Sequence, residues 1–167
     1  MSSLNDLKWS DIKSNTMNEN EYLNYIKQKG VYSNYKNYQI NKDKLDRLKQ
    51  KMDNDIHLLR IFAIGADWCP DCSKQLPALI KIIQEFGTPF YEIKILYGVK
   101  KNAFHKGDES PWHKRHSPPE ATNPKFNLIK IPTIYFFNED GNLLGRIVEK
   151  PKCSNTLEEE IWEIIKN

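Results

Sequence analysis

The segment IHLLRIFAIGADWCPDCSKQLPALIKIIQEFG, residues 56–87, decides the fold of this chain. Its first nine residues are almost all apolar, which is the pattern of a β-strand covered on both faces. After Cys72 the apolar residues recur with a helical period that stops at Gly87, so a helix is predicted there, with Pro77 inside it. Two cysteines separated by two residues therefore lie between a buried strand and a helix.

Outward from this segment, the sequence predicts an α/β domain with a mixed central sheet flanked by helices. Further strands are predicted at residues 90–96, 131–137 and 143–148. Asp140-Gly141 favours a tight hairpin between the last two strands. A final amphipathic helix is expected after Thr156, which forms a candidate capping box with Glu159.

The first 40 residues are predicted to be an N-terminal helical extension, and residues 41–167 the main domain. The extension should contain a helix capped by Asn18, and a second helix is expected at about residues 42–52. Residues 31–40 are interpreted as a short edge strand. The extension contains neither Cys nor His, so we expect no catalytic group from it.

Length and composition exclude several classes of protein. A chain of 167 residues suits one domain, and its net charge of +3 gives no reason to expect a nucleic-acid partner. No apolar run approaches the roughly 20 residues of a membrane span. The first residues lack the basic and apolar pattern of a secretory signal. We therefore expect a cytoplasmic protein with no nucleic-acid or membrane partner.

Cys69 and Cys72 have the spacing that thiol-disulfide exchange requires. At the start of a helix, unpaired N–H groups and the positive dipole end would favour the Cys69 thiolate, while Cys72, one turn later, would be shielded and act as the resolving thiol. Pro70 suits the first helical position. Asp71 either moderates Cys69 or helps to deprotonate Cys72. We expect no cofactor besides the redox-active disulfide Cys69-Cys72.

Metal binding is an alternative use of the same cysteines. Cys69 and Cys72 with His113 and His116 would make a two-Cys, two-His zinc set. The histidines lie in an irregular basic stretch without a clear scaffold, so we expect no metal. The third cysteine, Cys153, is interpreted as a lone structural or surface thiol.

The sequence resembles the thioredoxin family over about residues 40–167. The resemblance depends on five features: the WCPDC motif after an apolar strand, Pro77 five residues past the second Cys, Ile-Pro-Thr at 131–133, the Asp-Gly hairpin and the final amphipathic helix. It implies a thioredoxin-like fold and a cis peptide bond before Pro132. It also implies a substrate-binding surface formed by Trp68, Pro70, Ile131 and Pro132.

Two departures from the family pattern concern catalysis and access. Ala63 stands where thioredoxin has a buried Asp that assists the second Cys, which leaves Lys94 without its usual partner and makes Asp71 the candidate replacement. Asp71 and Lys94 are therefore candidate modulators. The stretch 98–126 is longer than the usual connection and has a net charge of +3. It either recognises acidic substrates or is a solvated loop.

The predicted function is a cytoplasmic thiol-disulfide oxidoreductase that reduces a restricted set of disulfides. Its partners would be protein or small-molecule disulfide substrates and an external reductase or reduced thiol. The restricted set is implied by a loose similarity of residues 111–114 (PWHK) to thioredoxin-related proteins with narrow substrate ranges. The alternative is a thioredoxin-like binding module without turnover, against which the two intact cysteines argue.

Overall fold

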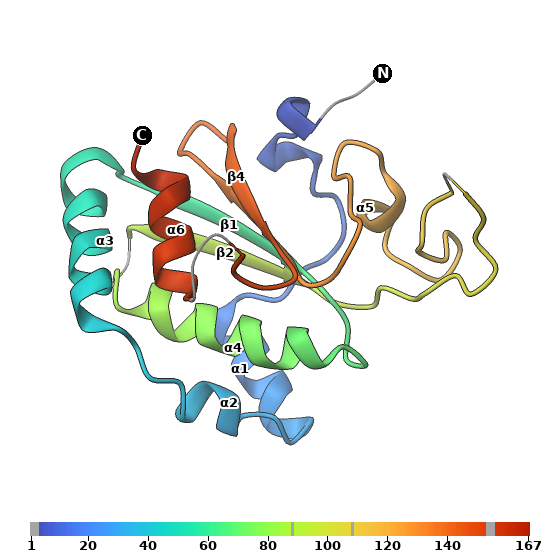
Figure 1. Cartoon of the computed structure of the whole chain (residues 1–167), viewed down its shortest axis with the longest axis horizontal. Coiled ribbons are helices and arrows are strands. Elements are labelled where there is room, and N and C mark those ends of the chain that lie inside the picture. The colour runs from blue at the N-terminus through green and yellow to red at the C-terminus, as the bar shows by residue number, and fades with distance from the viewer. Residues whose placement is uncertain (1–3, 88, 108, 153–155) are drawn as a thin grey trace.

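A computed structural model describes residues 4–87, 89–107, 109–152 and 156–167, so the prediction for Cys153 lies outside the described residues. The strands in these ranges form one four-stranded sheet with the order β2-β1-β3-β4 (Figure 1). Their bounds are β1 Leu59–Ile64, β2 Tyr91–Leu96, β3 Thr133–Phe137 and β4 Leu143–Val148. β1 and β2 are parallel, whereas β3 is antiparallel to both β1 and β4. The predicted mixed-sheet α/β architecture is confirmed.

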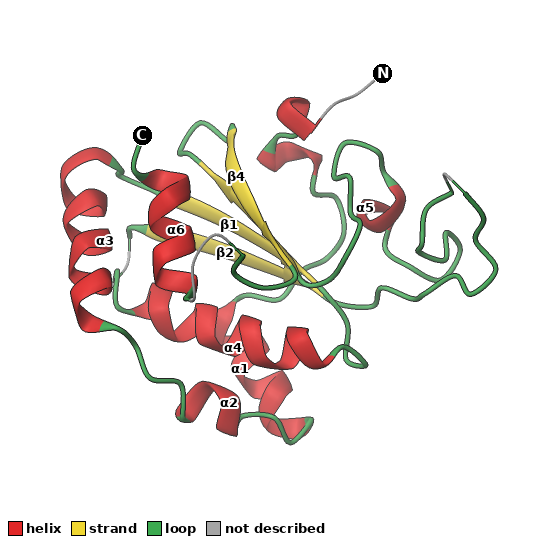
Figure 2. Ribbon diagram, in the orientation of Figure 1, coloured by secondary structure: helices red, strands yellow, loops and turns green. Residues whose placement is uncertain are grey.

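Of the α-helices in the described ranges, four lie where helices were predicted, whereas the short helices Ser33–Lys36 and Pro119–Thr122 were not predicted (Figure 2). The α-helices are α1 Glu19–Gln28, α2 Ser33–Lys36, α3 Lys42–Asp55, α4 Pro70–Gln84, α5 Pro119–Thr122 and α6 Leu157–Ile165. Asn18 caps α1 by accepting a hydrogen bond from the Glu21 N–H, and Thr156 caps α6 by accepting one from the Glu159 N–H. Both predicted caps are therefore confirmed. None of the helices in the described ranges is long and apolar enough to cross a membrane.

The two faces of the sheet are covered differently. Alternate residues of β1 point to opposite faces, as the period of a strand requires. Ile61 and Ala63 belong to a core shared with α1, α3, α4 and α6. Phe62 and Ile64 belong to a second core that is covered by irregular chain from the N-terminus and from the connection between β2 and β3. Both cysteines of the WCPDC motif are in this second core.

The N-terminal residues are part of the packed structure and cross the second face of the sheet. The backbone N–H of Trp9 donates to the Gly141 carbonyl at 2.9 Å, which fixes one end of this segment to the β3–β4 hairpin. Met17 exchanges two backbone hydrogen bonds with Ile95, of 2.8 and 2.9 Å, and so pairs with the exposed edge of β2. The side chain of Leu7 between these points is fully buried. The helical character of the extension is confirmed, and the division at residue 40 stays a prediction.

The prediction of an edge strand at residues 31–40 is wrong. The structure has the short helix α2 there, and Tyr35 of this helix contacts α4 instead of a sheet edge. The Tyr35 hydroxyl donates to Gln84 at 2.6 Å, and the Lys81 ammonium donates to the carbonyls of Lys36 and Tyr38 at 2.9 Å. Hydrogen bonds to α4 therefore replace the predicted strand pairing.

Pro77 lies inside α4, which is continuous across it. A proline has no backbone N–H, so the carbonyl four residues earlier loses its helical partner. That carbonyl belongs to Ser73, and it accepts a hydrogen bond of 2.9 Å from the side-chain amide of Asn34 in α2. The neighbouring helix thus supplies the hydrogen bond that the proline removes.

We predict that Asn34→Ala lowers the free energy of unfolding by about 1 kcal/mol, because a part-buried carbonyl loses its donor. Pro77→Ala restores a backbone N–H at that turn, so Asn34→Ala should cost clearly less in a Pro77→Ala background. Urea unfolding of wild type, both single variants and the double variant measures the difference. Asn37→Ala, at an exposed asparagine in the same connection, is the control. Equal costs of Asn34→Ala in the two backgrounds would contradict this account.

Candidate functional site

Cys69 occupies the N-cap position of α4. Its backbone is extended, and its sulfur accepts a hydrogen bond of 3.2 Å from the backbone N–H of Cys72. Pro70 fills the first helical position, as predicted, because a proline there loses no helical hydrogen bond. The sulfur therefore takes the place that a Ser or Asp oxygen takes at an ordinary helix start.

The surroundings of Cys69 favour its thiolate. Hydrogen bonding from the Cys72 thiol is the largest influence and lowers the pKa, burial opposes it, and the backbone N–H groups of Cys72 and Asp71 lower it further. Together they lower the pKa of Cys69 to about 7. A thiol with this pKa is about half ionised at neutral pH, whereas an ordinary cysteine is almost entirely protonated.

Cys72 has the opposite character. Its side chain is fully buried, and hydrogen bonding to the Cys69 sulfur together with burial raises its pKa. Gly65 permits this close packing, because a Cβ on Gly65 would lie 2.7 Å from the Cys72 sulfur and 3.3 Å from the Tyr97 ring. The Tyr97 hydroxyl is in turn hydrogen-bonded to the Tyr22 hydroxyl of α1 at 2.9 Å. Cys72 is therefore shielded behind Cys69, and both cysteines are free thiols.

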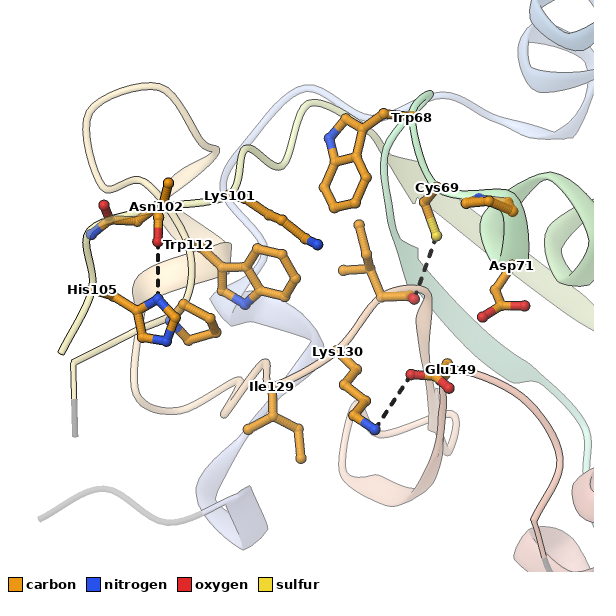
Figure 3. A pocket seen from close by; sticks show the side chains of 14 residues that line it. Trp68, Cys69, Asp71, Lys101, Asn102, His105, Trp112, Ile129, Lys130 and Glu149 are labelled. Carbon is orange, nitrogen blue, oxygen red and sulfur yellow. Dashed lines mark hydrogen bonds and ion pairs between the residues drawn. The ribbon is translucent and has the colours of Figure 1, made fainter. Parts of the chain in front are cut away.

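The segment before β3 reaches Cys69 from the other side. The Ile131–Pro132 peptide bond is cis, as the resemblance implied. The Cys69 thiol donates a hydrogen bond to the Ile131 carbonyl, with an S···O distance of 3.5 Å (Figure 3). The structure therefore brings Ile131 and Pro132 next to the cysteine pair, although they lie about sixty residues further along the chain.

Cys69 lines a cavity of about 480 Å³ (Figure 3). Only 5% of its surface is exposed, and that surface opens into this cavity. Of the predicted site residues, Trp68, Pro70, Asp71 and Ile131 also line this cavity. The remaining walls include Lys101, Asn102, His105 and Trp112, which belong to the stretch 98–126 singled out in the sequence, and Ile129, Lys130 and Glu149, for which sequence reasoning had no signal.

Part of the connection between β2 and β3 builds the far wall of the cavity and is packed there, whereas residues 103–107 and 114–116 are exposed. Trp112 is buried, and its indole N–H donates to the Leu128 carbonyl at 2.7 Å. Lys101 and Trp112 form an isolated antiparallel bridge, flanked by a hydrogen bond of 2.8 Å from the Asn102 N–H to the Pro111 carbonyl. Trp112 therefore serves as a structural wall of the site.

The two candidate modulators lie in different places. Asp71 lines the cavity, and its negative charge raises the pKa of both cysteines, although other influences on each thiol are larger. Lys94 does not line the cavity, and its ammonium lies 4.7 Å from the centre of the Trp9 ring. Only Asp71 is therefore positioned to influence the chemistry directly.

The histidines of the alternative zinc set do not meet the cysteines. The rings of His113 and His116 lie 4.6 Å apart, and the His116 N–H donates to the His113 ring nitrogen at 3.3 Å. Among the residues that the structure describes, no group of three or more His, Cys, Asp and Glu side chains is arranged to hold a metal ion. The two-Cys, two-His arrangement is therefore not formed.

Comparisons with known proteins agree with this geometry. A family model described as thioredoxin matches residues 16–101, just over half of the chain. Thioredoxin-like protein Clot from Arabidopsis thaliana is 28% identical over 83 residues, which are 50% of this chain and 54% of that protein. The alignment thus spans about half the length of this relative.

Two solved structures share the fold at low sequence identity. An HIV epitope scaffold superposes with a TM-score of 0.55 at 18% identity, covering 94% of this chain and 87% of its own. A protein of unknown function from Pseudomonas aeruginosa gives 0.50 at 22% identity, covering 92% and 81%. The predicted thioredoxin-like fold is confirmed.

We predict that alkylation of Cys69 by iodoacetamide follows a titration with a midpoint near pH 7. Replacing Cys72 by Ala removes the strongest stabilising donor, so the midpoint should move upward by about one pH unit. Rates are measured from pH 5 to 10 in a Cys153→Ser background, which removes the third thiol. A midpoint that does not move would show that the Cys72 thiol does not stabilise the thiolate.

Proposed function

Because the chain belongs to the thioredoxin family, we propose that it is a thiol-disulfide oxidoreductase with Cys69 and Cys72 as its redox pair. Cys69 is the nucleophile and Cys72 the resolving thiol. The observation that carries the proposal is the asymmetry of the pair. One sulfur caps a helix, has a pKa of about 7 and faces a cavity, while the other is fully buried behind it.

The proposed reaction takes place in two displacement steps. The Cys69 thiolate attacks one sulfur of a substrate disulfide, a bond forms between Cys69 and that sulfur, and the second substrate thiolate leaves and is protonated by solvent. Cys72 then loses its proton and attacks the Cys69 sulfur, which releases the first substrate thiolate. The substrate gains two electrons, and the protein ends with a Cys69-Cys72 disulfide. An external reductase or reduced thiol returns it to the dithiol.

Contacts at the site support the first attack and the approach of the substrate. The backbone N–H of Cys72 lies 3.2 Å from the Cys69 sulfur and holds the thiolate in place for attack. The Ile131 carbonyl is hydrogen-bonded to the Cys69 thiol, and both residues line the cavity. A substrate chain lying along residues 131–132 would place its sulfur in this cavity. Trp68, 43% exposed, forms the adjacent surface.

The direction we propose is reduction, in a cytoplasmic setting. The thiol pKa supports this direction, because thioredoxin, a reductant, has a nucleophilic cysteine with a pKa of about 7, whereas the strong oxidant DsbA has one of about 3.5. A pKa of about 7 for Cys69 therefore resembles that of a reductant. The walled cavity supports a restricted set of substrates, because an extended protein segment meets Trp68 and the Lys101–Trp112 wall before it reaches the sulfur.

Cysteine replacement tests the proposal in a Cys153→Ser background. With hydroxyethyl disulfide, Cys72→Ser should accumulate a mixed disulfide on Cys69, because the thiol that resolves it is absent. Cys69→Ser should form no adduct, and its turnover should fall to the uncatalysed rate. Intact-mass spectrometry detects the adduct, and circular dichroism checks that each variant is folded.

Two results would argue against this assignment. An adduct on Cys69→Ser but not on Cys72→Ser would reverse the roles of the two thiols. Binding of a disulfide without oxidation of the wild-type dithiol would instead identify a binding module.

A further inference from the structure

The cavity beside Cys69 has the size of a small-molecule site. Its volume of about 480 Å³ falls within the range of roughly 300–1,000 Å³ that small ligands occupy. Apolar side chains of Trp68, Pro111, Trp112 and Ile129 supply much of its lining. A group attached to a disulfide sulfur would therefore be enclosed by the cavity while Cys69 reacts with that sulfur.

One cation in the cavity is available for an anionic group. The Lys101 ammonium lies 5.3 Å from the centre of the Trp68 ring, and Figure 3 shows its side chain between Trp68 and Trp112. The Lys101 ammonium has neither an ion-pair partner nor a hydrogen-bond partner among the described residues. Lys130, the other lysine of the cavity, is already paired with Glu149 at 3.6 Å.

The backbone of Lys101 is held at the rim of the cavity, from which its exposed side chain reaches over the Trp68 ring. Residue 101 pairs with Trp112, and the preceding carbonyl, of Lys100, accepts the His113 N–H at 2.7 Å. The Lys100 N–H donates to the Ser117 hydroxyl at 2.9 Å. These contacts hold the start of the connection at the rim of the cavity.

The remaining charged and titratable groups of the cavity are Asp71, Glu149 and His105. In Figure 3, Asp71 and Glu149 lie on the right of the view, whereas Lys101 lies further left between Trp68 and Trp112. Glu149 is compensated by Lys130, and the His105 ring contacts the Asn102 carbonyl at 2.9 Å. The charges in the cavity are therefore separated. In the part of the chain that the structure describes, the unpaired positive charge of the cavity is that of Lys101, which lies between Trp68 and Trp112 and away from Asp71.

We propose that this cavity selects small disulfides whose sulfur-bearing groups end in a carboxylate, with Lys101 as the residue that binds the carboxylate. The inference rests on the proposed function and adds its substrate class. Both halves of such a disulfide leave as carboxylate-bearing thiols, and the two electrons come from Cys69 and Cys72. Lys101 takes no part in the electron transfer and acts only on binding and orientation.

Three small disulfides of similar length and different charge test the proposal: dithiodipropionate is anionic, hydroxyethyl disulfide neutral and cystamine cationic. Each is mixed with the reduced protein, and the rate of dithiol oxidation is divided by the rate of the same disulfide with dithiothreitol to remove intrinsic reactivity. We expect dithiodipropionate to exceed hydroxyethyl disulfide by about tenfold, the effect of a charge interaction of about 1.4 kcal/mol. Cystamine should be the slowest.

Lys101→Gln should lower the rate with dithiodipropionate about tenfold more than it lowers the rate with hydroxyethyl disulfide. The matched control is Lys100→Gln, which removes the same charge from the neighbouring residue but does not alter the lining of the cavity. Lys101→Arg should retain most of the preference. Added salt should reduce the difference in normalised oxidation rate between the anionic and neutral disulfides in the wild-type protein but not in Lys101→Gln.

The outcomes separate this inference from the function on which it rests. If cystamine reacts as fast as dithiodipropionate, or if Lys100→Gln and Lys101→Gln have equal effects, the substrate class is wrong while the oxidoreductase assignment stands. If none of the three disulfides oxidises the wild-type dithiol faster than it reacts with Cys69→Ser, the proposed function itself fails.

Discussion

The hydrogen bond from the Cys72 N–H to the Cys69 sulfur connects the fold to the chemistry. It satisfies one of the N–H groups that every helix leaves unpaired at its start, and it stabilises negative charge on the sulfur that accepts it. β1 ends at Ile64, four residues before Trp68, so the sheet delivers the chain to this helix start at a fixed place. Reactivity at Cys69 is therefore a property of the strand-turn-helix unit and needs no separate base beside that sulfur.

The deprotonation of Cys72 differs from that of Cys69. Thioredoxin has a buried Asp that assists its second cysteine, and Ala63 stands at that position here. Ala63 points into the core shared with the helices, whereas Cys72 packs in the core on the other face of the sheet. The polar groups behind Cys72 are the hydroxyls of Tyr22 and Tyr97, and burial raises the pKa of both, so they are not anionic near neutral pH. Asp71 stays the candidate for assisting Cys72, and its exposure in the cavity gives it direct access to solvent.

Sequence reasoning found the parts of the site that depend on local pattern. The strand, the helix start at Cys69, both helix caps and the approach of Ile131-Pro132 follow from short stretches or from the family resemblance. It missed α2, because whether Tyr35 pairs with a sheet edge or with Gln84 depends on a helix fifty residues away. It also did not single out Lys101 within the basic stretch 98–126. Lys101 pairs with Trp112 and lines the cavity, whereas Lys114 and Arg115 of the same stretch do not line it.

The wall that shapes the cavity is itself supported by the N-terminal segment. Glu120 of α5 is almost fully buried and accepts hydrogen bonds from the Lys13 and Ser14 N–H groups and the Ser14 hydroxyl, at 2.6–2.9 Å. Burial alone would raise the pKa of Glu120, but these donors hold it below its usual value. The same face of the sheet thus carries both the N-terminal segment and the connection that contains Lys101. Because neither covers that face alone, the N-terminal segment helps to hold the connection that forms the cavity wall in place beside Cys69.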